Sequence, residues 1–257
     1  MKMNFIISII LLALLLNSIS STFIRNLLHK KSHKSHRSQM FTNEDKKIIV
    51  QTHNKLRNDV ALGLTKPKLP FASNMIQMYY SDEIGTKAQQ WTNNKKFKHS
   101  SSAYRRQPDY ACGENIYMTW MSGGKPKKNW ERCIKSWYGE IKDMGGKSVD
   151  NFASGGPVTG HFTQTVWAHS YIVGCGFVQF DDDGWIAQLY VCQYGPVGNI
   201  MGMPIYNSSK QQGCQCEAGL TCANTTYPGL CCPKGKCKAD SLDWSGKPYP
   251  GTNPNIR

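Results

Sequence analysis

The sequence predicts an α+β fold in which helices cover a small antiparallel sheet, followed by a small disulfide-rich C-terminal module. Three segments with apolar residues at helical spacing precede two apolar runs that flank the turn Asp183-Gly184. Residues 112–118, CGENIYM, are expected to add a further strand. Six of the 10 cysteines then fall within the 24 residues from Cys214 to Cys237. So few residues cannot build a core of their own, which predicts a module held by disulfides.

The first 20 residues have the features of a secretory signal peptide. Lys2 precedes the largely apolar residues 5–16, and small residues alternate at Ser18 and Ser20. Spanning the hydrocarbon of a membrane takes about 20 apolar residues, and no segment of the chain offers such a run. We therefore expect a secreted, extracellular protein without a transmembrane segment.

Residues 21–40 are basic and rich in histidine, with little that could pack into a core, and are expected to be disordered. His29, His33 and His36 leave a metal-binding tract as an alternative to a solvated spacer or pro-segment. Beyond residue 40 the chain keeps 25 basic and 17 acidic residues, a net charge of +8. This diffuse charge favours an anionic surface as a partner, and export argues against nucleic acid.

Three helices are expected in the main domain, residues 41–205. Thr42 caps the first, over residues 44–62, whose apolar stripe includes His53, interpreted as a core histidine and not as a ligand. The second begins near Ser73, and the third carries the stripe of residues 130–141. Candidate buried residues of the second helix are Met75, Met78, Tyr79, Ala88 and Trp91; those of the third are Trp130, Cys133, Ile134, Trp137 and Ile141, with Glu140 at the flank.

The turn fixes the register of the hairpin that ends this domain. Asp183-Gly184 favours a two-residue turn because both positions need positive φ. Facing residues then have numbers that sum to 367, so Cys175 faces Cys192 on a non-hydrogen-bonded rung, where Cα atoms lie about 4.5 Å apart. That spacing allows a disulfide. A longer loop would shift the register and leave two ordinary buried cysteines.

Two segments resemble the signature motifs of the CAP superfamily, which includes cysteine-rich secretory proteins, venom allergens and plant pathogenesis-related proteins. They are GHFTQTVWAHS, residues 160–170, and LYVCQYGPVGNI, residues 189–200; the first departs from the pattern only at Thr165. HNKLR, residues 53–57, is similar to the first-helix pattern of the family, and residues 82–100 resemble its second helix and the histidine that follows. The resemblance covers residues 41–205 and implies a three-layer α/β/α sandwich of the CAP (SCP) type.

The resemblance also implies a polar tetrad formed by His99, Glu114, Glu140 and His161. Two neutral imidazoles are good ligands for zinc or another divalent cation, and carboxylates can complete the shell or orient the rings. We expect His99 and His161 to bind the ion, with the glutamates as outer partners. Similarity to lipid-binding CAP proteins implies sterol or fatty-acid ligands as well.

Related secretory proteins often have a cysteine after the CQY string, where this chain has Gly195. The loss of that partner favours a bond between Cys112 and Cys133. In the cysteine-rich module, residues 206–237, the sequence does not choose among 15 possible pairings. Export and adjacent Cys231-Cys232 favour disulfides over a zinc site. Residues 238–257 are expected to form a flexible tail, and Asn207 and Asn224 begin glycosylation sequons.

Three classes of function compete. The first is a secreted binding or signalling module with a metal-responsive His/Glu cleft. The second is a hydrolase that uses the tetrad as acid and base, although the chain has no HExxH or GxSxG motif and no visible activated nucleophile. The third is a toxin-like effector that acts on an extracellular protein through the cysteine-rich tail. This tail has fewer cysteines than channel-regulating modules at a similar position, which argues against channel activity.

Overall fold

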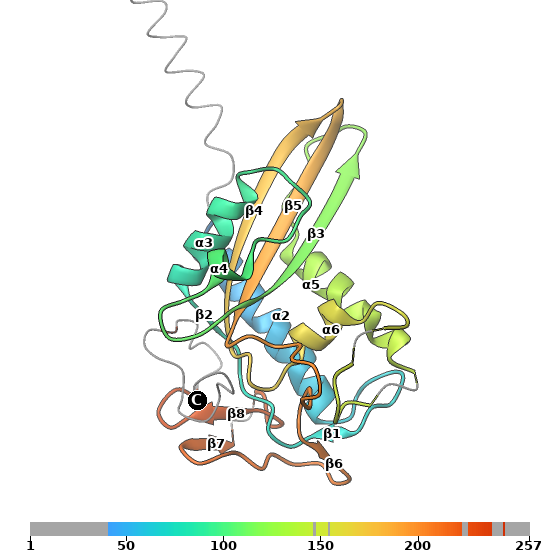
Figure 1. Ribbon diagram of the computed structural model, residues 1–257, viewed down its shortest axis with the longest axis vertical. Coiled ribbons are helices and arrows are strands. Elements are labelled where there is room, and N and C mark those ends of the chain that lie inside the picture. Colours follow the sequence, from blue (N-terminus) through green and yellow to red (C-terminus); the bar gives the residue numbers. More distant parts are fainter. Residues whose placement is uncertain (1–40, 146–147, 154, 223–225, 238–243, 245–257) are drawn as a thin grey trace, which may run out of the picture. The chain divides into compact units, whose positions relative to one another are not determined.

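A four-stranded sheet in the order β2-β4-β5-β3 forms the centre of the fold (Figure 1). The computed structural model describes residues 41–257 except 146–147, 154, 223–225, 238–243 and 245–257, so the predicted signal peptide and residues 21–40 lie outside it. β4 and β5 form the antiparallel hairpin, β3 runs antiparallel to β5, and the short β2 lies parallel to β4. The strands are β2 (Tyr79–Tyr80), β3 (Gly113–Met121), β4 (Ile172–Asp182) and β5 (Trp185–Gly195).

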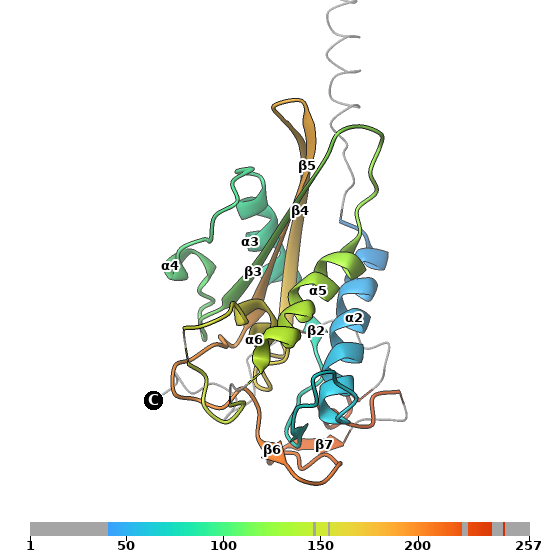
Figure 2. The same cartoon turned by 90° about the vertical axis from the view of Figure 1, so that its right-hand side faces the viewer.

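Helices cover both faces of this sheet. Figure 2 shows the sheet edge-on, with α3 and α4 on one side and α2 and α5 on the other. This arrangement confirms the predicted three-layer α/β/α sandwich. The helices are α2 (Asn43–Ala61), α3 (Asp82–Thr92), α4 (Ser102–Arg105), α5 (Trp130–Tyr138) and α6 (Gly160–Thr165), and α5 continues into the 3-10 helix η1 (Gly139–Met144).

Helix α2 begins as predicted. Thr42 and Asp45 form a capping box, in which each side chain bonds the backbone N–H of the other residue. His53 is fully buried, with Nδ1 2.8 Å from the Ile49 carbonyl oxygen and Nε2 3.0 Å from the Tyr194 hydroxyl. Since a carbonyl can only accept, Nδ1 carries the proton and Nε2 accepts from the tyrosine. The interpretation of His53 as a core histidine is confirmed.

The second helix begins later than predicted, at Asp82, where the Ser81 side chain caps it. The preceding residues are extended because other elements take their backbone groups. The Asn54 side chain binds both the N–H and the carbonyl of Met78, and Tyr79 N–H donates to Tyr171 O. Every side chain from Met75 to Tyr80 is buried, including the polar Gln77, which is a continuous buried run and not a helical stripe.

Two glycines of β4 allow α3 to lie directly on the sheet. A Cβ at Gly174 would lie 2.1 Å from the Gly85 nitrogen, and one at Gly176 would lie 2.5 Å from the Gln89 Cα. The outer edge of β4 is covered in part by side chains that imitate a neighbouring strand. The Tyr80 hydroxyl bonds both backbone groups of Cys175, and the Gln89 amide does the same for Phe177.

The hairpin register is the predicted one. Asp182 faces Trp185, Asp183 and Gly184 have φ of 51° and 82°, and Cys175 faces Cys192. The latter two form a disulfide with their Cα atoms 4.1 Å apart. The turn dipeptide and the alternation of rungs therefore predicted this bridge correctly.

The predicted bond between Cys112 and Cys133 is wrong, because both are buried free thiols. Cys133 lies on α5 and packs in the core between α2, α5 and the sheet, with Tyr194. Cys112 precedes β3 and packs with Ile84 of α3, on the opposite face of the sheet. Burial raises the pKa of the Cys112 thiol to about 12, so this thiol is protonated at neutral pH.

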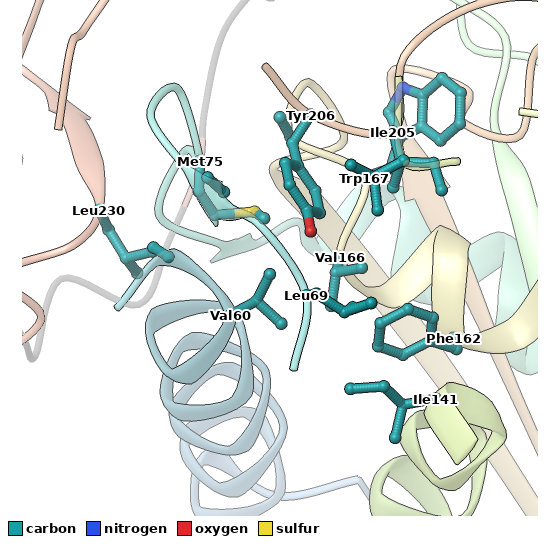
Figure 3. Packing of buried hydrophobic residues seen from close by; sticks show 14 of the residues in the cluster. Val60, Leu69, Met75, Ile141, Phe162, Val166, Trp167, Ile205, Tyr206 and Leu230 are labelled. Carbon is teal, nitrogen blue, oxygen red and sulfur yellow. The ribbon is translucent and has the colours of Figure 1, made fainter. Parts of the chain in front are cut away.

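The cysteine-rich module is built into the core of the main domain. Cys231 N–H donates to Met75 O, and Gln77 N–H donates to Cys231 O. Leu230 packs with Val60 and Met75 (Figure 3). The six cysteines pair as Cys214–Cys222, Cys216–Cys231 and Cys232–Cys237. The short strand β6 (Ser208–Ser209) pairs with β1 (Phe71–Ala72). Strand β7 (Leu220–Cys222) pairs with β8 (Cys231–Pro233).

One residue of the predicted flexible tail is anchored. Trp244 is the residue of 238–257 that the structure describes, and it is buried. Its backbone N–H donates to Tyr80 O at 2.7 Å, and its indole ring packs against the rings of Tyr79 and Tyr171. The Lys236 ammonium lies 4.3 Å from the centre of the indole. At this position the flexible-tail prediction is wrong, because an aromatic slot on the main domain holds the indole.

Candidate metal centre

The first His–Glu pair joins the loop after α3 to strand β3. Glu114 lies opposite Gln193 in the register of β3 and β5, and Gln193 Nε2 donates to Glu114 Oε2 at 3.0 Å. The other oxygen, Oε1, lies 2.9 Å from His99 Nδ1. Ser100 donates to both carboxylate oxygens, from its backbone N–H at 2.8 Å and its hydroxyl at 2.6 Å. These contacts fix the position of the carboxylate and orient the imidazole.

The Glu114 carboxylate is charged although its side chain is only 1% exposed. Burial alone would raise its pKa, but hydrogen bonds from His99, Ser100 and Gln193 together outweigh this effect and hold the pKa below its usual range. The His99 side chain, by contrast, is 60% exposed. A buried anion therefore supports an accessible imidazole from behind.

The second pair joins η1 to α6. His161 Nδ1 lies 2.7 Å from Glu140 Oε1, and the backbone N–H groups of His161 and Phe162 donate to Glu140 Oε2 at 2.9 and 3.2 Å. The residue before α6, Thr159, supplies no side-chain cap, so Glu140 satisfies the first N–H groups of this short helix. The Trp137 ring stacks on the His161 imidazole with centroids 6.3 Å apart. Local folding of α6 and orientation of His161 thus depend on one carboxylate.

The four predicted tetrad residues form two pairs and not one cluster. No three of them have ligand atoms within 4.8 Å of one another. Among the described residues, neither His99 Nε2 nor His161 Nε2 has a hydrogen-bond partner, while both Nδ1 atoms are held by carboxylates. Asn115, the neighbour of Glu114, links the two pairs by donating to His161 O at 3.0 Å. Sequence patterns do not indicate Gln193, whose contact with Glu114 depends on the register between β3 and β5, or Ser100, which reaches Glu114 from the loop after α3.

A second group of possible ligand atoms lies in the cysteine-rich module. The sulfurs of Cys214, Cys216 and Cys222 lie within 4.8 Å of one another. All three are in disulfides, so none offers the thiolate that a zinc ion requires. The histidine–glutamate pairs are therefore the better candidate for a metal.

In the described part of the chain, no helix has both the length and the hydropathy needed to cross a bilayer. The fold and the site together define a disulfide-stabilised α/β/α domain with a His/Glu tetrad drawn from four elements. The chain belongs to the cysteine-rich secretory protein (CAP) family, whose family model matches residues 50–194, more than half of the sequence.

The relatives include venom proteins of several arthropods. Scoloptoxin SSD976 of Scolopendra dehaani is 38% identical over 187 residues, which cover 72% of this chain and 83% of the relative. "CRISP/Allergen/PR-1" of Trittame loki is 38% identical over 193 residues, covering 73% of this chain and 48% of the relative. Venom allergen 5 of Tityus serrulatus is 35% identical over 222 residues, covering 82% and 50%. The chain spans about half the length of these last two relatives.

The chain is also similar to solved structures. The structure of NaASP2 with Zn2+ aligns with a TM-score of 0.61 and 32% identity, covering 76% of this chain and 98% of that one. The structure of BmVAL-1 aligns with a TM-score of 0.62 and 26% identity, covering 76% and 97%.

Proposed function

We propose that this chain is a secreted CAP-family binding protein that holds a divalent cation, zinc first, through His99 and His161. The observation that supports this proposal is the shared geometry of the two pairs, in which a carboxylate takes Nδ1 and leaves Nε2 as the ligand atom. Metal-binding histidines almost always donate their other ring nitrogen to a carboxylate, a carbonyl or water, because that contact fixes the tautomer and raises ligand basicity. The residues present therefore fit the group.

The donor set fits zinc with water or a ligand in the remaining positions. Zinc accepts imidazole nitrogen readily, and a site with fewer than four protein ligands keeps open positions. A bound ion would act there as a Lewis acid for whatever occupies those positions. The zinc-containing structure of the similar protein NaASP2 supports the choice of metal. Neither carboxylate needs to bind the ion directly, which agrees with their separation into two pairs.

Zinc binding should weaken in acid. Imidazole must be neutral to coordinate a metal, so protons compete with zinc for the two Nε2 atoms and affinity should fall as the pH is lowered.

Titration calorimetry with zinc on the compact unit Phe41–Arg257 tests the site, since this unit lacks His29, His33 and His36. The His99→Ala/His161→Ala protein should lose the saturable binding. His169→Ala is the matched control: His169 also contacts a glutamate, Glu217, at 2.7 Å, and its side chain is 28% exposed against 29% for His161. Equal zinc uptake by the double variant and the unsubstituted unit would rule out the proposed site.

Sterol or fatty-acid binding is a second candidate. A hollow of about 390 Å³ lies between the start of α2 and α3, lined by Phe41, Tyr80 and the Lys46–Asp82 ion pair. Its volume is within the range of small-ligand sites, and its aromatic rings suit an apolar chain. Mass spectrometry of lipids that copurify with the secreted protein tests this candidate separately from the metal.

A further inference from the structure

The loop after α3 carries an exposed aromatic ring among lysines. Phe97 is 61% exposed and lies in the sequence Lys95-Lys96-Phe97-Lys98, which we call the basic aromatic loop. All three lysines are exposed. Between residues 84 and 108 the chain has six basic residues and no acidic one: Lys87, Lys95, Lys96, Lys98, Arg105 and Arg106. Positive charge is therefore concentrated in residues 84–108, whereas it is diffuse over the chain as a whole.

The basic aromatic loop is held in a fixed shape. Lys95 N–H donates to Thr92 O, and Lys95 adopts a φ of 56°, which ends the helical path of α3. The Trp91 indole N–H donates to Lys98 O at 2.8 Å and so fastens the far end of the loop to the helix. The Lys95 ammonium lies 5.7 Å from the centre of the Phe180 ring on β4, consistent with the course of this loop beside the hairpin in Figure 1. Little ordering is then required when the loop meets a partner.

The charges of the loop are not neutralised within the protein. None of the ion pairs among the described residues includes Lys95, Lys96 or Lys98. The carboxylate nearest in sequence on the adjoining strand, Glu114, is buried and engaged with His99 and Ser100. The acidic residues 181–183 follow Phe180 at the hairpin tip, and among the described residues none of them forms an ion pair with a lysine of the loop.

We propose that the basic aromatic loop docks this protein on an anionic phospholipid surface, with Phe97 entering the interfacial layer and the lysines lying over the lipid headgroups. Clustered lysines are attracted to anionic lipid, and an aromatic side chain among them adds apolar burial. A sulfated polysaccharide would use the same cations but gains nothing from an exposed Phe97. His99, the next residue after the loop, would then face the membrane boundary.

Vesicle co-sedimentation of the secreted protein tests this docking, with a chelator present so that the outcome does not depend on the metal proposal. Binding is expected to phosphatidylcholine vesicles that contain phosphatidylserine, and not to phosphatidylcholine alone. Added salt should weaken it, because the charges are exposed. Equal binding to both vesicles, or to neither, would overturn the proposal.

Substitutions of Phe97 test whether the contact lies at the basic aromatic loop and how much the aromatic ring contributes to it. Phe97→Ser should lower partitioning about tenfold or more, because an apolar ring no longer leaves water. Leu64→Ser is the matched control, since Leu64 is 66% exposed on the loop after α2 and is followed by Lys66 and Lys68. Phe97→Trp should retain binding. An effect of Leu64→Ser as large as that of Phe97→Ser would show that the contact is not at this loop.

Removal of the lysine charges tests the electrostatic contribution to vesicle binding. The triple change Lys95→Gln/Lys96→Gln/Lys98→Gln should lower partitioning on the order of 100-fold, from about fivefold for each lysine. The control with the same net charge carries Lys66→Gln/Lys68→Gln/Lys142→Gln and should stay near the unsubstituted protein. If Phe97→Ser binds vesicles normally while the triple change abolishes binding to both vesicles and heparin, the surface recognises polyanions in general and the membrane assignment is wrong.

Discussion

Replacement of Arg57 by methionine should destabilise this protein more than a typical single substitution. Arg57 lies on α2, is fully buried, and donates five hydrogen bonds to the carbonyl oxygens of Ile76, Thr165, Trp167 and Ala168. Burial lowers the pKa of its guanidinium to about 9, which still leaves it charged at neutral pH. One side chain thus fastens the first helix to the extended segment before α3 and to the turn that follows α6.

The magnitude follows from what the carbonyls would lose. In Arg57→Met, Trp167 O keeps a bond from Ser170 N–H and Ala168 O keeps one from Ile76 N–H. Among the described residues, Ile76 O and Thr165 O would keep none. Each orphaned buried carbonyl costs about 1 to 3 kcal/mol, so we expect a loss of about 4 kcal/mol.

Guanidinium denaturation followed by tryptophan fluorescence, with the disulfides intact, measures this loss. A thermal scan should show a fall in melting temperature of roughly 10 °C. Lys55→Met is the control on the same helix, because Lys55 is exposed and forms only a surface pair with Asp59; it should cost less than about 0.5 kcal/mol. A loss for Arg57→Met as small as that of the control would refute the reasoning, because water would then be replacing the guanidinium at the two carbonyls.

Two further predictions concern buried titratable groups. Burial lowers the pKa of His53 to about 4, so between pH 6.5 and 4 this histidine is protonated in the unfolded chain but neutral in the native protein. The free energy of unfolding should therefore fall by about 3 kcal/mol as the pH drops through that window. His53→Gln should show a shallower dependence of stability on pH. An unchanged slope in that variant would assign the pH dependence to other groups. A thiol reagent should find no reactive cysteine in the native protein and two, Cys112 and Cys133, after unfolding, whereas a bond between them would yield none in either state.

The parts of the fold that the sequence predicts well depend on local rules. Asp183-Gly184 fixes a two-residue turn, and the alternation of rungs then brings Cys175 to Cys192 without further information. The start of α2 follows from the capping box between Thr42 and Asp45, three residues apart. Each of these features is complete within one element or one hairpin.

The errors arise where a distant residue decides the local structure. The segment before α3 is extended because Asn54 and Arg57 of another helix take its backbone groups. Helix α6 is not among the three helices that the sequence predicts, because its N-terminus is capped by Glu140, 21 residues before His161, and not by a neighbouring side chain. The pairing of Cys112 with Cys133 failed because sequence alone does not show that they lie on opposite faces of the sheet.

The position of the cysteine-rich module changes how a toxin-like role must be tested. Deletion of residues 206–257 would remove Leu230, which fills the core beside Val60, and Cys231, whose backbone bonds Met75 and Gln77. Loss of activity after such a deletion would then report an exposed core as readily as a missing effector. Substitutions at exposed residues of the module avoid this ambiguity, because Lys210 and Lys234 can change while the disulfides and Leu230 stay in place. An effector surface on the module can therefore be located only by surface changes that preserve its contacts with the main domain.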